Sequence, residues 1–206
     1  MIISIPILEQ LNLYLFQLIN APVEVNPGIL QIGTFFARDA IVLFPLMLFS
    51  NLFWRGKKTK KVVLVASLSM LFSIVINVAI EKIFMIYHLR PFMIPLGQHF
   101  LSHPANNSFP SNHMSLSCAI SFSMIISRIL RWQGIFLFVI SIVIAWARIY
   151  MGVHFPLDMA GSLVVACISV VLSLRCSTLV GKIYTHVYER FYSFCSHFVR
   201  KNITKK

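Results

Sequence analysis

The chain has 206 residues, of which 58% are hydrophobic and only 12% charged, and its mean hydropathy is +0.80. Soluble domains average about 25% charged residues, so this composition excludes an ordinary soluble domain. The net charge of +12 does not indicate nucleic-acid binding, because the basic residues cluster between long apolar blocks. The sequence therefore predicts an all-α, polytopic membrane helix bundle with five or six transmembrane helices.

The predicted elements begin with an apolar segment at residues 7–19 that also contains Glu9, Gln10, Asn12 and Gln17. These polar residues favour an interfacial or partly inserted helix within residues 1–22, and a sixth span is the alternative. Five apolar runs of roughly the 20 residues that a bilayer core requires follow. They lie at residues 41–54 (with a start near 35), 62–80, 114–129, 135–149 and 157–174.

Charge placement predicts the topology. Fourteen of the 18 basic residues lie at residues 55–61, 128–131 and 175–206, and the positive-inside rule places all three clusters in the cytoplasm. Arg38 and Asp39 are expected at the start of the first span as an interfacial ion pair. The prediction is one membrane domain at residues 1–176 and a cytoplasmic, basic, amphipathic tail at residues 177–206. Residues 81–113 and 150–156 then lie outside.

The two outer segments contain nearly all of the remaining polar chemistry. Asp158 follows His154 by four residues, and Pro156 between them favours the first turn of a helix, so the carboxylate can reach back to the imidazole. A carboxylate beside lipid is costly without a partner, and a carboxylate that orients a histidine prepares a nucleophile. Two arginines, a second histidine and a serine accompany this pair, namely Arg90, Arg148, His113 and Ser111.

Simpler interpretations of single residues remain open at this point. Arg90 can be an interfacial anchor, and Ser111 can be the N-cap of an ordinary helix. A zinc site built from His99, His103, His113 and His154 is the alternative chemistry. Two arginines in the same place would repel a cation, so a site for an anion is favoured.

Three segments, at residues 82–92, 108–113 and 147–158, resemble the type-2 phosphatidic acid phosphatase superfamily, whose pattern is K-x6-R-P, then P-S-x-H, then S-R-x5-H-x3-D. The string Pro-Ser-Asn-His at 110–113 matches the second motif, and Arg148, His154 and Asp158 match the third. Ala147 replaces the usual serine, and Lys82 lies eight residues before Arg90 rather than seven. Over roughly residues 8–175 the chain most resembles the bacterial undecaprenyl-diphosphate phosphatases of the bacitracin-resistance type, which also have a degenerate first motif.

This resemblance implies a vanadium-haloperoxidase-like phosphatase core and phosphoryl transfer through a phosphohistidine, with no metal and no cofactor. His154 would attack phosphorus, Asp158 would orient its ring, and His113 would act as the general acid and base. The residues expected to bind substrate are Arg90, Arg148, Ser111, Asn112, His88 and Lys82.

The expected partners are a polyprenyl diphosphate lipid and the surrounding membrane lipids, with no nucleic acid. The expected place is a bacterial cytoplasmic membrane with the site facing the periplasm or outside, and raised expression is expected to protect against bacitracin. The alternative substrates are phosphatidylglycerol phosphate, phosphatidic acid and lipid A, and a lipid A phosphotransferase is also open. A small transporter with a phosphate pocket is the alternative outside the enzymes. The sequence predicts no oligomeric state.

Overall fold

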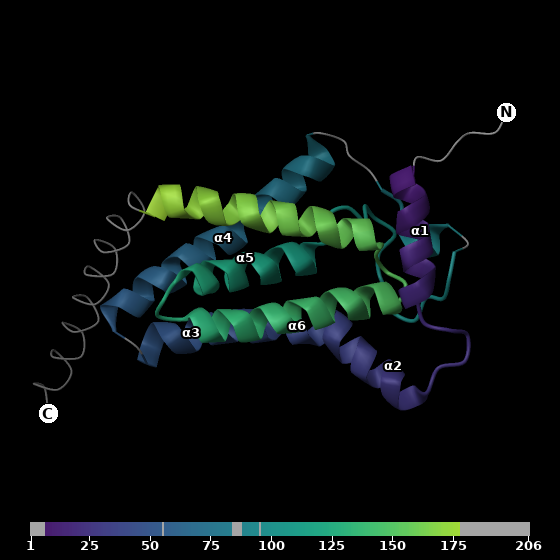
Figure 1. Ribbon diagram of the computed structural model, residues 1–206, viewed down its shortest axis with the longest axis horizontal. Coiled ribbons are helices and arrows are strands. Elements are labelled where there is room, and N and C mark those ends of the chain that lie inside the picture. Colours follow the sequence, from purple (N-terminus) through teal and green to yellow (C-terminus); the bar gives the residue numbers. More distant parts are fainter. Residues whose placement is uncertain (1–6, 55, 84–87, 95, 178–206) are drawn as a thin grey trace, which may run out of the picture.

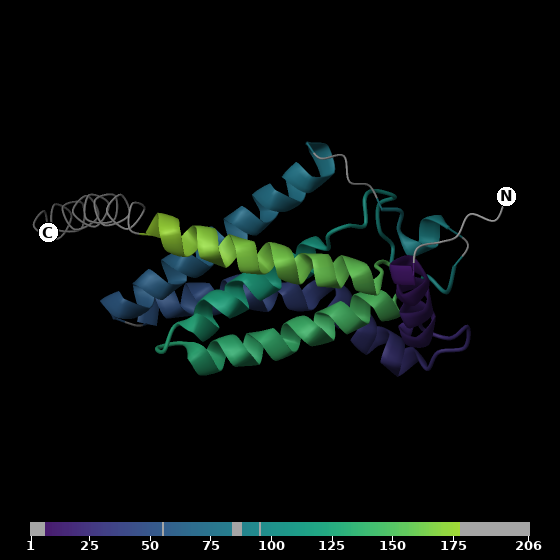
Figure 2. The same cartoon turned by 45° about the horizontal axis from the view of Figure 1, so that its top comes forward.

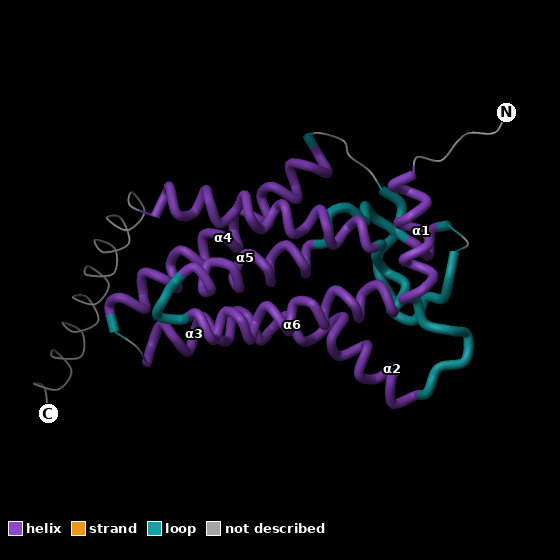
Figure 3. The backbone as a smooth tube through the Cα atoms, in the orientation of Figure 1, coloured by secondary structure: helices purple, strands orange, loops and turns teal. Residues whose placement is uncertain are grey.

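The computed structural model describes residues 7–54, 56–83, 88–94 and 96–177, which form helices joined by loops (Figure 3). The predicted all-helical fold is confirmed. The predicted tail lies outside the described residues except for Ser177. The helices are α1 (Ile7–Ile19), α2 (Pro27–Thr34), α3 (Leu43–Trp54), α4 (Lys57–Lys82), α5 (Asn112–Ile126), α6 (Arg131–Tyr150) and the helix Pro156–Ser177. Three shorter turns are η1 (Phe35–Asp39), η2 (Ala40–Val42) and η3 (Pro91–Met93).

Among the described residues, four helical segments are long and apolar enough to cross a membrane: Pro27–Phe53, Lys57–Lys82, Arg131–Tyr150 and Pro156–Ser177. The helix α5 is also apolar but has only 15 residues, and it packs against both α4 and α6. The helices lie side by side along the long axis of the molecule (Figure 1). These segments correspond to the five predicted spans, and the multi-pass prediction is confirmed.

The first span begins at residue 27, and the predicted start near residue 35 was wrong. Asn26 caps α2 by accepting a hydrogen bond from the Gly28 N–H at 2.8 Å, and Pro27 occupies the first helical position. Both features favour a helix start. Arg38 and Asp39 therefore lie inside the continuous helical path, in the π-helical turn η1, where they form an exposed pair at 2.9 Å.

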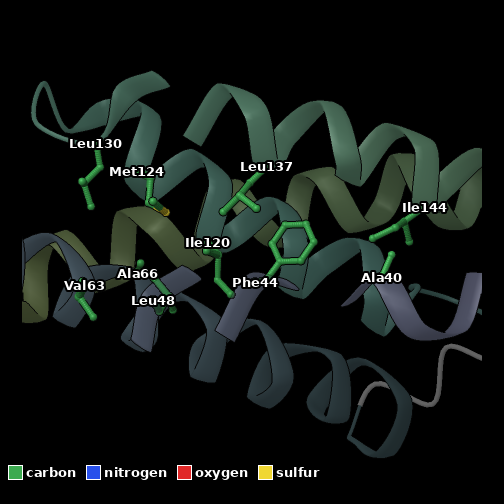
Figure 4. Packing of buried hydrophobic residues seen from close by; sticks show 10 residues of the cluster. All are labelled: Ala40, Phe44, Leu48, Val63, Ala66, Ile120, Met124, Leu130, Leu137 and Ile144. Carbon is green, nitrogen blue, oxygen red and sulfur yellow. The ribbon is translucent and has the colours of Figure 1, made fainter. Parts of the chain in front are cut away.

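The core of the bundle is formed where α3, α5 and α6 meet. Phe44, Ile120 and Leu137 are fully buried at this junction (Figure 4). Within a membrane the lipid is as apolar as this core, so close packing and interhelical hydrogen bonds hold the helices together. One such bond links the buried Ser123 to Ser69 of α4, with 2.8 Å between the hydroxyl oxygens. This packing fixes the positions of α5 and α6. The candidate site lies where α5 begins and α6 ends.

One end of the bundle is covered by α1 and by the loop that joins α4 to α5. The two views in Figures 1 and 2 show α1 lying across this end, roughly at right angles to the bundle. The Leu157 N–H donates to Asn12 Oδ1 at 2.9 Å, and Asn20 Nδ2 donates to the Tyr150 carbonyl at 3.1 Å. The helix is thus attached to the segment between α6 and the last helix, where the candidate site lies.

Candidate active site

The His154–Asp158 pair has the geometry that the sequence predicts. Pro156 begins the last helix, so Asp158 lies in its first turn. Its Oδ2 accepts hydrogen bonds from His154 Nδ1 at 3.1 Å and from the Phe155 N–H at 2.8 Å. Both side chains are buried. The carboxylate is therefore fixed against one ring nitrogen of the histidine.

Gly152 makes the turn that brings His154 to this position. It has a φ of +77°, a left-handed conformation that L side chains rarely adopt. A Cβ atom at this residue would also collide with the carbonyl oxygen of Gln98. The close approach of two loops requires glycine here, and His154 follows two residues later.

The hydrogen bonds of His154 define its tautomer. Its Nε2 lies 3.2 Å from Arg90 Nη1 and 3.3 Å from Arg148 Nη2. A guanidinium can only donate, so Nε2 accepts and Nδ1 carries the proton toward Asp158. Burial, reinforced by the positive charge of Arg148, lowers the pKa of His154 to about 3. The imidazole is therefore neutral, and its Nε2 lone pair faces the two arginines.

Arg90 is held rigidly by the loop around it. Its Nη1 donates to the Val153 carbonyl at 2.9 Å, its Nη2 to the Asn107 carbonyl at 2.9 Å, and its Nε to Asn106 Oδ1 at 3.0 Å. The side chain is buried. Acceptors from two separate segments thus fix the plane of the guanidinium before any ligand binds.

Arg148 is held from the opposite side by the first span. Its Nη1 donates to the Ala37 carbonyl at 2.7 Å, within the π-helical turn η1. Single π turns inside helices are frequent at functional sites. Its Nη2 also lies 3.2 Å from His103 Nε2, and burial lowers the pKa of His103 to about 4. This neutral ring therefore accepts the hydrogen bond.

Two further groups of the second motif face the same region. His113 is hydrogen-bonded to the backbone of Arg38, also in η1. Ser111 occupies the N-cap position of α5, as the sequence allowed, but its side chain makes no capping hydrogen bond. Its Oγ and the Nε of Arg148 are buried without a hydrogen-bond partner among the described residues. Buried donors of this kind call for an acceptor.

The arrangement is suited to an oxyanion. Arg90 and Arg148, two buried cations, converge on one neutral nitrogen, and a bound anion would relieve their repulsion. Paired N–H donors of guanidinium groups match phosphate oxygens geometrically. A phosphorus atom held there would lie directly in front of the lone pair of His154.

Comparison with known proteins identifies the family. The model of the PAP2 superfamily matches residues 41–182. The chain belongs to the PAP2 superfamily. YbjG of Escherichia coli K12 is 35% identical over 165 residues, which cover 79% of this chain and 82% of YbjG. The undecaprenyl-diphosphatase BcrC of Bacillus subtilis 168 is 31% identical over 171 residues, 82% of this chain and 86% of BcrC.

A solved PAP2-like structure agrees with these sequence matches. The crystal structure of Aquifex aeolicus LpxE has a TM-score of 0.63 and 28% sequence identity, and the likeness covers 80% of this chain and 95% of LpxE. The predicted superfamily is thus confirmed, and so is the resemblance to undecaprenyl-diphosphatases.

Not every predicted substrate-binding residue of this PAP2 chain lies in the cluster. Lys82 lies one residue farther from Arg90 than the first motif requires, and its exposed side chain at the end of α4 pairs with Glu81 at 3.0 Å. Asn112 uses its side-chain oxygen to accept from Asn77 Nδ2 of α4 at 2.6 Å, a bond between two helices.

His88 lies behind the reactive nitrogen rather than beside the arginines. Its Nδ1 is 3.0 Å from Asp158 Oδ1, the carboxylate oxygen that does not face His154. The structure places His88 against Asp158, and its predicted contact with substrate stays a prediction.

The sequence reasoning missed the roles of three residues near the site, and it considered His103 only as a zinc ligand. Ser108 donates to Asp158 Oδ2 and lies 3.2 Å from His154 Nδ1. Its position three residues before Ser111, in the same short string, was the available signal. Asn106 on Arg90 and His103 on Arg148 lie in an irregular loop, where spacing carries no information on contacts.

Of the four histidines of the zinc alternative, His103 and His154 lie close together, with 6.3 Å between their ring centroids. His99 stacks on Phe92 at 4.3 Å between ring centroids, and His103 and His154 each face Arg148. Within the described ranges, no three His, Cys, Asp or Glu side chains are grouped as metal ligands.

Proposed function

We propose that this PAP2 chain is an integral membrane phosphatase that hydrolyses undecaprenyl diphosphate to undecaprenyl phosphate and inorganic phosphate. The observation that carries the proposal is the environment of His154. Its Nδ1–H is held by Asp158, and its Nε2 faces the guanidinium groups of Arg90 and Arg148. The names of relatives such as BcrC support the choice of lipid.

The first half of the reaction forms a phosphohistidine. The terminal phosphate binds to Arg90 and Arg148, and two orphan donors, Ser111 Oγ and Arg148 Nε, complete its hydrogen bonds. A bond forms between His154 Nε2 and phosphorus as the anhydride P–O bond breaks. His113 gives a proton to the departing undecaprenyl phosphate, and Asp158 stabilises the positive charge on the ring of His154.

The second half returns the enzyme to its starting state. A water molecule attacks the phosphorus and loses its proton to His113, and the Nε2–P bond breaks. Inorganic phosphate leaves, and His154 regains its neutral form. General acid–base catalysis of this kind contributes typically about 10²–10⁴-fold.

The proposed orientation places the site outside the bacterial cytoplasmic membrane. The connections that bear Lys57 and Arg128 lie at the end of the bundle opposite the site (Figure 1), as the positive-inside rule requires of cytoplasmic loops. Single cysteines in a cysteine-free background test this. We expect Val23→Cys to react with an impermeant thiol reagent in intact cells, and Trp132→Cys to react only after permeabilisation. The reverse pattern would contradict the orientation.

The helix α1 is proposed to lie in the outer membrane interface. Its 13 residues measure about 20 Å at 1.5 Å per residue, which is too short for a bilayer core of about 30 Å. Leu8, Leu11 and Leu18 are exposed on its outward side, where they would contact lipid.

The activity is tested with purified protein in detergent. Phosphate release is compared for undecaprenyl diphosphate, phosphatidylglycerol phosphate, phosphatidic acid and lipid A, each with and without a metal chelator. We expect the highest kcat/KM with undecaprenyl diphosphate, no effect of the chelator, and loss of activity in His154→Asn. A higher kcat/KM with another lipid would identify that lipid as the substrate in place of undecaprenyl diphosphate. An absence of phosphate release from every lipid would favour the transporter alternative.

A further inference from the structure

The carboxylate of Asp158 has partners on both oxygens. Oδ2 faces His154, the Phe155 N–H and Ser108, whereas Oδ1 faces His88 Nδ1 at 3.0 Å. An ionised carboxylate accepts about four hydrogen bonds, and Asp158 is completely buried. His88 therefore holds Oδ1 of the carboxylate, while the other three groups hold Oδ2.

His88 also lies between two carboxylates. Its Nε2 is 3.8 Å from Glu9 Oε1 of α1, on the side opposite Asp158. The hydrogen bond to Asp158 raises the pKa of His88, and the negative charge of Glu9 adds to this effect. The charged groups that face the ring are thus Glu9 and Asp158. A protonated ring donates to Asp158 Oδ1 and attracts Glu9 across 3.8 Å.

The position of His88 is fixed by its backbone. Its N–H donates to Asn107 Oδ1 at 2.8 Å, and its carbonyl accepts from the Ser108 N–H at 2.8 Å. The ring also packs on Phe155, with 5.1 Å between centroids. These contacts leave the two ring nitrogens directed at the carboxylates.

Glu9 is in turn connected to the helix that carries Asp158. Asn12 Nδ2 lies 3.4 Å from Glu9 Oε1, while Asn12 Oδ1 accepts from the Leu157 N–H. Glu9 and Asn12 of α1 therefore face the protein beside the buried Phe16, whereas Gln10 and Gln17 are exposed. The two polar contacts on the inner side of α1 connect this helix to the site as well as to the core.

We propose that Glu9 and His88 are positioning residues that extend the Asp158–His154 pair into a relay, Glu9–His88–Asp158–His154. Glu9 holds His88, His88 fixes the rotation of Asp158, and Asp158 fixes the tautomer of His154. The inference rests on the proposed phosphatase activity. The relay gives α1 a part in the reaction, because this helix supplies Glu9, the residue of the relay that lies farthest from His154.

Kinetics of purified variants test the relay on undecaprenyl diphosphate. We expect His88→Ala to lower kcat about 10- to 100-fold, as small displacements of reacting groups do, with KM nearly unchanged. His88→Asn, whose amide N–H₂ can replace Nδ1–H, should recover most of the loss. Glu9→Gln should lower kcat about 3- to 10-fold in the wild-type background and have no further effect in His88→Ala, because members of one relay are not additive. Glu24→Gln, which removes an exposed carboxylate, is the matched control.

The outcomes separate the possible roles. A raised KM with unchanged kcat in His88→Ala would assign His88 to substrate binding and overturn the relay, and so would additive losses in the double variant. Thermal unfolding in detergent shows whether each variant is folded. If His88→Ala is misfolded, kcat is compared between His88→Asn and the double variant His88→Asn/Glu9→Gln. Additive losses of kcat in this pair would likewise overturn the relay.

A second readout does not depend on turnover. In protein with ¹⁵N-labelled histidine, the signals of His154 are those absent from His154→Asn. We expect a single Nδ1–H tautomer in the wild type and a mixture of tautomers in His88→Ala. An unchanged His154 tautomer would overturn the relay even if kcat falls. A wild type with this tautomer but without phosphate release would instead count against the proposed function.

Discussion

Replacing Arg148 by lysine is expected to lower kcat/KM by roughly two orders of magnitude. The change keeps the positive charge but removes the planar group whose Nη1 is held by the Ala37 carbonyl and whose Nε and Nη2 face the site. Hydrogen bonds to charged groups contribute about 1.5–3 kcal/mol each. The loss of two such bonds to phosphate costs about 3 kcal/mol at the lower limit, or roughly 150-fold at 1.4 kcal/mol per tenfold change.

The assay is phosphate release from undecaprenyl diphosphate by purified Arg148→Lys protein in detergent. Arg128→Lys is the control, since this residue is exposed at the opposite end of the bundle. We expect the control to match the wild type. A folded Arg148→Lys protein within about threefold of wild-type kcat/KM would refute the paired-donor reasoning, because a point charge would then suffice.

Three other changes test the local geometry. Gly152→Ala should lower the melting temperature and abolish phosphate release, because a left-handed alanine costs about 1–2 kcal/mol and its Cβ meets the Gln98 carbonyl. Ser108→Ala should lower kcat about tenfold, measured in the same assay, because Asp158 loses a donor. The folded pKa of His154 is about 3, so the folded ring stays neutral down to about pH 3, whereas the unfolded ring takes up a proton below about pH 6.5. As the pH falls from there, unfolding takes up a proton, and stability should fall by about 1.4 kcal/mol per pH unit. His154→Asn should flatten this slope in melting curves.

The spans were predictable because membrane thickness demands long apolar runs, which composition alone reveals. The start of the first span was not, because Pro27, Gly28 and Gln31 dilute its hydropathy. The structure locates this start at the Asn26 cap. The π-helical turn that follows has no signature in the sequence, although it supplies the carbonyl that holds Arg148.

The residues of the site were predictable where spacing along a helix fixes geometry. His154 and Asp158 are four residues apart, and the helix that begins at Pro156 between them lets Asp158 in its first turn reach back to the ring. Glu9, Asn106 and His88 could not be placed, because their positions depend on how α1 and the loop before α5 fold over the bundle. Lys82 is exposed and pairs with Glu81 at the end of α4, a position that its similarity to the first motif does not predict.

The most direct test of the central claim is a rapid-quench experiment with undecaprenyl diphosphate labelled in its terminal phosphate with ³²P. Attack by His154 predicts protein-bound label that forms within one turnover, is stable to alkali, is released by acid, and is absent from His154→Asn. Equal labelling of His154→Asn, or phosphate release by that variant at the wild-type rate, would contradict the assignment of His154 as the nucleophile.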